Sequence, residues 1–402
     1  MRLAVITIVF VYPHRRRWVM CCNTRIWHSH HCILPPYVSR QIAQNGSPQQ
    51  RTQALRTLSI DNTLRAIRLS SSGAPQAAKR MIPGPMVVES HKLRTIYDVK
   101  NSEALPGREI RKEGTDDTGD AAVDEAYVGL GGTYDLYWEV FGRNSIDGNG
   151  MPLNAHVHYG SGYDNAFWDG ERMVFGDGDG DLFNRFTIAV DVIGHELAHG
   201  VTEHEGPLAY FLQAGALNEH MSDVFGSLVK QRLLNQQAEQ ADWLIGAGLL
   251  TDRVQGKALR SMKDPGTAFD DPVLGKDPQP ALMKDFVNTW EDNGGVHINS
   301  GIPNKAFCLA AINLKGYAWE KAGLIWLETL RDSRLKPNAS FLSFARLTVT
   351  AAVRLFGSGE EEQIVRDAWN QVGIKVSKER AGAPAWTPQM PKQATQPVQR
   401  KH

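Results

Sequence analysis

The sequence predicts an α+β protein with two lobes, a β-rich lobe followed by a mainly helical one. Between about residues 94 and 181 the pattern is that of strands and turns, with one helical stretch near 121–141. The apolar spacing then changes to about 3.6 residues over 188–203 and 215–234, and again through most of 302–373. At 402 residues, the chain is long enough for two or three folded units.

The composition excludes several classes of protein. Hydrophobic residues make up 42% of the chain and charged residues 22%, as in a soluble globular protein. The 10 Trp and 14 Phe imply a substantial core, so the chain is not a collagen, a coiled coil or a wholly disordered protein. Lys+Arg and Asp+Glu number 44 each, so there is no net charge to favour binding to nucleic acid or an anionic membrane. We therefore expect a soluble monomeric enzyme with neither kind of partner.

Changes in composition divide the chain into units. The expected units are a leader or N-terminal extension (1–32), a compact segment with a breaker-rich linker (33–92), the β-rich lobe (93–204), the helical lobe (205–374) and a disordered tail (375–402). The leader holds an apolar run too short to span a bilayer, followed by a basic cluster and no clean cleavage site. An export signal and an upstream start codon both stay open. We expect a secreted or extracellular protein, with cytoplasmic retention as the alternative.

A His-Glu-x-x-His pattern occupies residues 195–199. On a helix, His195 and His199 lie on one face, and neutral imidazoles are usual zinc ligands. Glu196 lies at the edge of that face, where it can take a proton from a metal-bound water. A pattern of this length also occurs by chance in ordinary helix packing, so the choice of a third ligand decides between the two interpretations.

The third ligand is sought further along the chain. A metzincin needs glycine at 202 and histidine at 205, but this chain has Thr202 and Glu205. Glu219 follows on a second amphipathic helix, where it shares a face with Asp223. Carboxylates on such an apolar face are costly unless they meet a cation or a donor. Glu219 can bind the metal, and Asp223 can accept the outer N–H of a ligating histidine, whereas the alternative is a solvated acidic face.

Several ordered motifs resemble the thermolysin-type zinc endopeptidases. They are HELAH (195–199), GALNEHMSD (215–223), DNGGVHINSG (292–301), NAFW (165–168), GDGDG (176–180) and LRSM (259–262), and together they span roughly 95–374. ILPPY, at 33–37, resembles the short propeptide of the protealysin-like branch. The resemblance implies a thermolysin-like two-lobed metalloprotease with its zinc site in the cleft between the lobes, so 33–92 is expected to be a propeptide and linker.

The resemblance also implies a role for each matching residue of the reactive centre. Zinc is expected on His195, His199 and Glu219, and Glu196 is expected to be the general base for attack by the zinc-bound water. The other residues implied at the centre are the oxyanion donors His297 and Tyr210, Asp292 as the residue that orients His297, and Asp223 and Asn218 beside the metal ligands.

Substrate contacts are implied in the same way. Asn165 and the backbone of Ala166 match the edge segment that binds an extended peptide, and Arg260 matches the arginine that bonds a substrate carbonyl. The expected apolar pocket for the residue after the cleaved bond consists of Phe183, Phe186, Val192, Ile245 and Leu259. We thus predict a zinc-dependent neutral endopeptidase, made as a proenzyme, that cuts peptides and proteins before bulky hydrophobic residues. A catalytically silent peptide-binding homologue and an exopeptidase are the alternatives.

The chain departs from the calcium-rich members of the family. It keeps Asp191 and Asp242 but has Lys230, Leu244 and Ala247 where acidic calcium ligands are expected. We hypothesise that the Lys230 ammonium replaces the cation by pairing with Asp191 or Asp242. Calcium binding is therefore doubtful, whereas zinc is expected.

The propeptide resemblance predicts latency. Pro35, Pro36 and Tyr37 are expected against the reactive cleft, where the stiff prolines suit an inhibitor that fits the groove without being cut. Removal of this inhibitor would follow a cleavage within 80–95. A Cys32 thiolate on the zinc is a second conceivable lock.

Overall fold

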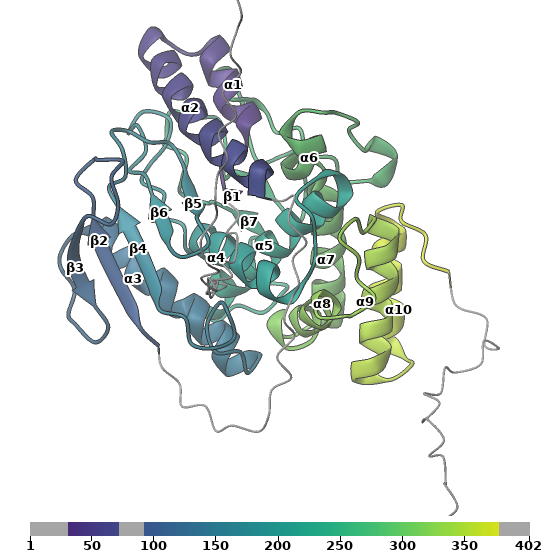
Figure 1. Cartoon of the computed structure of the whole chain (residues 1–402). Helices are drawn as coiled ribbons and strands as arrows, with labels where there is room; N and C mark the ends of the chain where they lie inside the picture. Colours follow the sequence, from purple (N-terminus) through teal and green to yellow (C-terminus); the bar gives the residue numbers. More distant parts are fainter. Residues whose placement is uncertain (1–30, 72–91, 378–402) are drawn as a thin grey trace, which may run out of the picture.

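The computed structural model describes residues 31–71 and 92–377. Its strands and helices form a first lobe built on a sheet and a second lobe built from helices (Figure 1). This arrangement confirms the predicted α+β class. The predicted leader and tail lie almost wholly outside the described residues. Among the helices that are described, none is both long and apolar enough to cross a membrane.

A six-stranded sheet forms the first lobe, in the spatial order β1-β5-β6-β4-β2-β3. Its strands are β1 (His31–Cys32), β2 (Arg94–Asp98), β3 (Arg108–Lys112), β4 (Leu153–Val157), β5 (Ala166–Trp168) and β6 (Met173–Phe175). β4 pairs in parallel with β2 and β6, whereas β5 pairs antiparallel with β6 and with β1. Two short antiparallel pairs are β7 (Leu244–Ile245) with β8 (Arg260–Ser261) and β9 (Asp270–Asp271) with β10 (Gly275–Lys276).

Helices account for most of the remaining described residues. They are α1 (Pro36–Asn45), α2 (Pro48–Ser71), α3 (Ala121–Asp135) with the π-helix η1 (Leu136–Val140), α4 (Val190–Glu205), α5 (Leu212–Leu233), the 3₁₀ turn η2 (Met283–Asp285), α6 (Asp292–Asn299), α7 (Gly301–Leu314), the π-helix η3 (Trp319–Gly323), α8 (Leu324–Leu330), α9 (Phe341–Phe356) and α10 (Glu360–Gln371). Asp120 caps α3 and Ser340 caps α9 through side-chain hydrogen bonds. α4 and α5 correspond to the helices predicted at 188–203 and 215–234.

The described part of the N-terminal region, residues 31–71, is called here the N-terminal segment. It consists of β1, α1 and α2, which form the purple part of the molecule in Figure 1. β1 adds to the edge of the sheet at β5 (residues 166–168), so two residues assigned to the leader belong to the folded sheet instead. The stripe Ala54, Thr57 and Asp61 forms the buried face of α2, so this segment packs as part of the fold.

α4 and α5 approach each other closely through two glycines. Gly194 of α4 faces Gly226 of α5, and a Cβ at Gly194 would lie 3.0 Å from the Gly226 Cα. A Cβ at Gly226 would collide with the carbonyl oxygen of Asp191 and lie 3.0 Å from the backbone nitrogen of His195. Side chains at these two positions would force the helices apart. The missing side chains therefore set the separation between the functional groups that the two helices carry.

His158, directly after β4, joins two carboxylates from other parts of the first lobe. Its Nδ1 lies 2.8 Å from Oδ2 of Asp177, and its Nε2 lies 3.1 Å from Oδ2 of Asp120, the residue that caps α3. The hydrogen bond to Asp177 is the main cause that raises the pKa of His158 to about 9, with partial burial opposing it and Asp120 adding to it.

This shift predicts a pH dependence of stability. Because the folded-state pKa lies above the ordinary value of about 6.5, the imidazolium contributes its full stabilisation below about pH 6.5. This contribution is lost as the pH rises toward 9. Allowing for solvent screening, we expect the free energy of unfolding to fall by about 1 kcal/mol from this group. Urea titrations near pH 6 and pH 9.5 should show this fall in the wild type. His158→Asn, whose side chain tolerates the positive φ of 58°, should lack it, and an equal fall in both proteins would contradict the assignment.

Candidate metal centre and active site

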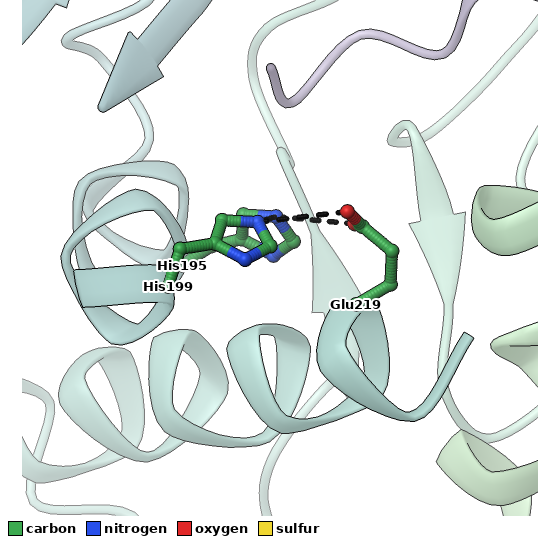
Figure 2. A group of neighbouring side chains, drawn as sticks. All are labelled: His195, His199 and Glu219. Atoms are coloured by element: carbon green, nitrogen blue, oxygen red, sulfur yellow. Dashed lines mark hydrogen bonds and ion pairs between the residues drawn. The ribbon is translucent and has the colours of Figure 1, made fainter. Parts of the chain in front are cut away.

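Three buried side chains converge where α4 meets α5. His195 and His199 come from α4 and Glu219 from α5, and each is at most 1% exposed. The two Nε2 atoms are 3.1 Å apart, with Nε2 of His195 3.4 Å from Oε2 of Glu219 and Nε2 of His199 3.6 Å from its Oε1 (Figure 2). Three ligands at about 2.0–2.1 Å around one tetrahedral ion lie about 3.3–3.5 Å apart. The triad therefore has the dimensions of a zinc site.

The chemistry of these donors also fits a cation. Oε2 of Glu219 is buried and, within 31–71 and 92–377, makes no hydrogen bond. A buried carboxylate oxygen is costly without a donor or a cation, and two imidazoles with one carboxylate form a known zinc ligand set. These residues therefore fit zinc better than calcium or magnesium, which prefer oxygen ligands.

Polar partners fix the orientation of both imidazoles. Nδ1 of His195 donates to Oδ1 of Asp223 and Nδ1 of His199 donates to Oδ1 of Asn218, each over 2.8 Å. A proton on Nδ1 leaves the lone pair of Nε2 directed into the triad. Asp223 also accepts bonds from Nη2 of Arg260 and Nδ2 of Asn304, each at 2.8 Å. Asp223 thus links a histidine of the triad to Arg260.

The buried charges balance one another. Burial alone would lower the pKa of His195, but the hydrogen bond to Asp223 and the neighbouring Glu219 carboxylate raise it to about 9. Burial opposes ionisation of both carboxyl groups, yet the Arg260 charge holds the pKa of Asp223 far below its usual range, and the neighbouring histidines do the same for Glu219. Both acids are therefore carboxylates at neutral pH.

Three further predicted residues surround the triad. Glu196 is buried, and its Oε2 accepts a hydrogen bond from the backbone nitrogen of Trp168 in β5 over 3.1 Å. Tyr210 donates to Oε1 of Glu219, and its hydroxyl lies 3.3 Å from Nε2 of His297. That nitrogen is 3.4 Å from Oε1 of Glu219. Glu196 therefore lies against β5, whereas Tyr210 and His297 lie together at Glu219.

A left-handed turn brings Asp292 to His297. Residues 292–295 have φ values of 53°, 52°, 85° and 74°, which glycine at 294 and 295 adopts without steric penalty. A Cβ at Gly294 would also approach Cδ2 of Leu212 to 2.5 Å. The turn lets Oδ2 of Asp292 accept the backbone N–H of His297 over 2.9 Å, while Oδ1 lies 2.7 Å from the ring Nδ1. Both the position and the angle of the imidazole are thereby held.

The predicted peptide-binding residues contact the N-terminal segment. The Ile33 nitrogen donates to the Ala166 carbonyl over 3.2 Å, and the Leu34 nitrogen donates to Oδ1 of Asn165 over 2.9 Å. Nη1 of Arg260 donates to the Ile33 carbonyl over 3.1 Å. These bonds continue the antiparallel pairing of β1 with β5. The chain's own N-terminal segment thus lies on the edge strand as an added strand.

The five residues predicted for the apolar pocket are all buried. The ring centroids of Phe183 and Phe186 are 6.0 Å apart, and the Leu259 nitrogen donates to the Ile245 carbonyl. Val192 lies one turn before His195 on α4. All five belong to the main apolar core of the molecule, and their role in binding a substrate side chain stays a prediction.

Cys32 corrects one expectation. Its thiol lies 4.0 Å from Oδ1 of Asp61 and packs in a small apolar cluster with Phe167, whereas its carbonyl oxygen lies 3.2 Å from Nε2 of His297. The conceivable thiolate lock on the metal is therefore wrong. Cys32 approaches the triad with its backbone because the alternation of side chains along β1 turns the thiol to the other side.

The hypothesis about Lys230 is confirmed in its geometry. Its Nζ lies 2.8 Å from Oδ2 of Asp191 and 2.8 Å from Oδ1 of Asp242, and it donates to the Leu244 carbonyl over 2.6 Å. Asp242 and the Leu244 carbonyl accept hydrogen bonds from the ammonium group, and Asp191 forms an ion pair with it. The lysine therefore fills the space between the two carboxylates.

Sequence reasoning missed Asp61 of α2. This buried carboxylate accepts bonds from the Tyr163 hydroxyl over 2.7 Å and from Nδ2 of Asn165 over 2.8 Å. Through Asn165 it connects the N-terminal segment to the peptide-binding edge. The sequence signal was the helical spacing of Asp61 from Ala54 and Thr57, which places its carboxylate on the same buried face of the helix.

Comparison with known proteins agrees with this geometry. Residues 86–203 match the thermolysin metallopeptidase catalytic domain, and residues 206–374 match the thermolysin metallopeptidase alpha-helical domain. An extracellular metalloprotease of Pectobacterium carotovorum subsp. carotovorum is 52% identical over 347 residues, which are 86% of this chain and 97% of that protein. Protease PrtS of Photorhabdus sp. (strain Az29) is 50% identical over 349 residues, covering 86% of this chain and 93% of that protein.

A solved structure is similar over nearly the same length. The precursor of protealysin, a metalloproteinase from Serratia proteamaculans, shares 56% identity with a TM-score of 0.77, covering 86% of this chain and 99% of that one. The sheet-containing lobe and the helical lobe described above are those of this fold. The chain is a peptide-hydrolysing metalloprotease and belongs to the thermolysin family of metallopeptidases.

Proposed function

We propose that this metalloprotease is a zinc-dependent neutral endopeptidase that is made as a latent proenzyme and secreted. In this proposal the Lys230 ammonium takes the place of a calcium ion. The observation that carries the proposal is the strand β1, which lies on β5 as a bound peptide would and brings a carbonyl to the metal triad. Relatives named as extracellular metalloproteases support secretion. The resemblance to a protease precursor supports the proenzyme.

In this proposal zinc is held by His195, His199 and Glu219. When bound there, zinc lowers the pKa of a coordinated water to about 7 and so supplies a nucleophile at neutral pH. Asp223 and Asn218 hold the two imidazoles in the tautomer that presents Nε2. Substituting Asp223 or Asn218 would therefore weaken zinc binding and would not act directly on the hydrolysis step.

The remaining residues act on the water and the substrate. Glu196 takes the proton of the attacking water and passes it to the nitrogen of the leaving amine. Tyr210 and His297, which lie together at Glu219, donate hydrogen bonds to the carbonyl oxygen as it gains negative charge. Asp292 keeps the ring of His297 aimed at that oxygen.

Substrate positioning falls to the edge strand and Arg260. Asn165 and the Ala166 backbone bond the extended peptide, and Arg260 bonds the carbonyl of the residue after the cleaved bond. All three groups form bonds of the same kind with the N-terminal segment. A silent peptide-binding homologue has no need for a base and two donors around the triad. The presence of Glu196, Tyr210 and His297 therefore favours a catalytically active enzyme over a silent homologue.

We expect a strong preference at the position after the cleaved bond. An N-acetylated peptide with an internal Leu should be cut before that residue about 10²-fold faster than the same peptide with Asp there, because burying an unpaired carboxylate in an apolar pocket is costly. Mass spectrometry of the products gives both the site and the rate. Internal cleavage of the blocked peptide separates endopeptidase from exopeptidase, and similar rates for Leu and Asp would rule out the proposed pocket.

We also expect the uncut chain to be latent. Hydrolysis by protein with an intact N-terminal segment should be slower than that by matured protein by roughly 10²-fold or more, because a tethered segment acts at a millimolar effective concentration. Asp61→Ala should raise the initial rate of the uncut chain by about tenfold, since the bond from Asn165 is lost. Arg56→Ala, which breaks an exposed ion pair with Glu103 and an exposed hydrogen bond to the Ser161 carbonyl, is the matched control. Equal rates for uncut and matured protein would refute latency.

A further inference from the structure

The N-terminal segment presents one particular peptide bond to the reactive groups. The Cys32 carbonyl oxygen lies 3.2 Å from Nε2 of His297, the proposed oxyanion donor, and this nitrogen is 3.4 Å from Oε1 of Glu219. In Figure 2 the purple ribbon of the segment lies above the three labelled side chains. The next carbonyl, that of Ile33, bonds Arg260. The bond between Cys32 and Ile33 therefore occupies the position at which a substrate would be cut.

The side chains around this bond fit the same register. Ile33 is fully buried and belongs to the apolar core that contains all five predicted pocket residues. Cys32 lies in the other apolar cluster, next to Phe167, its partner across the strand pair. The residue after the bond is thus a bulky apolar one, as the proposed specificity requires.

The two prolines do not protect this bond. Pro35 and Pro36 lie two and three residues beyond Ile33, and Pro36 begins α1. The Leu34 nitrogen, between the bond and the prolines, still donates to Asn165. The prolines end the added strand and turn the chain into a helix, because they have no N–H to continue the pairing. Both prolines are buried, but they lie after the reactive position and not at it.

We propose that the enzyme hydrolyses its own Cys32–Ile33 bond within the same molecule. The proposal rests on the function proposed above for this site. One water is consumed: its oxygen bonds the Cys32 carbonyl carbon as Glu196 takes one of its protons, the C–N bond breaks, and Glu196 passes that proton to the Ile33 nitrogen. The second proton of the water is released when the new carboxylic acid ionises. The products are a carboxylate at Cys32 and an amine at Ile33. Residues up to Cys32 leave, whereas the chain from Ile33 stays bound through Asn165 and α2, so this cut precedes removal of the remaining N-terminal segment.

The test follows the N-terminus of the full chain. Purified zinc-loaded protein is sampled over time by intact-mass spectrometry and N-terminal sequencing at two concentrations tenfold apart. We expect a new N-terminus at Ile33 whose rate of appearance does not change on dilution. Ile33→Asp should form this terminus at least tenfold more slowly, whereas Ile33→Leu should resemble the wild type and Glu196→Gln should stay uncut.

Casein hydrolysis in the same samples separates this inference from the proposed function. A chain that degrades casein while its Cys32–Ile33 bond stays intact would overturn the self-cleavage and leave the proposed peptidase standing. A rate of appearance that falls tenfold on dilution would also overturn cleavage within one molecule. A zinc-loaded chain that neither degrades casein nor forms the new terminus would refute both.

Discussion

Replacing Glu196 by Gln is expected to lower kcat for peptide hydrolysis toward the upper end of the 10²–10⁴-fold range of a lost general base. The amide has the same shape, and its oxygen can still accept the hydrogen bond from the Trp168 nitrogen. It cannot accept a proton from water at neutral pH. Neither ring nitrogen nor carboxylate of the triad is altered, so metal binding should persist. Initial rates on a blocked peptide measure the loss.

Zinc content is the control for this variant. Elemental analysis should find one zinc ion per chain in both wild type and Glu196→Gln, which separates loss of the base from loss of the metal. A chelator should abolish activity of the wild type, and added zinc should restore it. Equal casein hydrolysis by wild type, chelated wild type and variant would refute a metallopeptidase mechanism and favour the silent binding homologue.

Replacing Lys230 by Met is expected to lower the free energy of unfolding by about 3–5 kcal/mol, because it leaves the buried Asp191 carboxylate without its cation. Burial would lower the pKa of Lys230, but Asp191 and Asp242 raise it above the ordinary value. The ammonium is therefore present through the neutral range, and its contribution is lost only as the pH rises above about 10.4. Urea unfolding at pH 7 measures the change as a shift in midpoint.

A surface ion pair is the matched control for this loss. Arg253 pairs with Asp181, but its side chain is 77% exposed, compared with 9% for Lys230. Arg253→Ala should therefore change the stability by less than about 1 kcal/mol. Millimolar calcium should leave the wild type unchanged. A large calcium-induced rise in its melting temperature, or a Lys230→Met loss no larger than that of Arg253→Ala, would contradict the proposal that the lysine replaces a bound cation.

The metal centre was the part of the molecule most open to prediction from sequence. The spacing of His195 and His199 fixes their common face through local helix geometry alone. The pairing of Glu219 with this face needed an argument from burial, since its helix comes later in the chain. The roles of Tyr210 and His297 came only from the family resemblance, because contacts across 87 residues leave no local periodicity in the sequence.

The N-terminal segment shows where such reasoning ends. Its helical character is readable from apolar spacing, but the addition of β1 to β5 joins residues more than a hundred positions apart. The direction of the Cys32 thiol depends on the register of that pairing, and a shift of one residue would exchange its two faces. Asp61 bonds Asn165 only because α2 docks beside the same edge. These features are set by tertiary contacts.

When the N-terminal segment departs, β5 becomes the outermost strand of its sheet. A bare strand of this kind invites other chains to pair with it, which is a route to aggregation. β5 contains only three residues, a length of about 10 Å, so it offers few backbone groups to a neighbouring molecule. Its brevity lets the protease accept short stretches of foreign polypeptide while limiting its tendency to assemble with copies of itself.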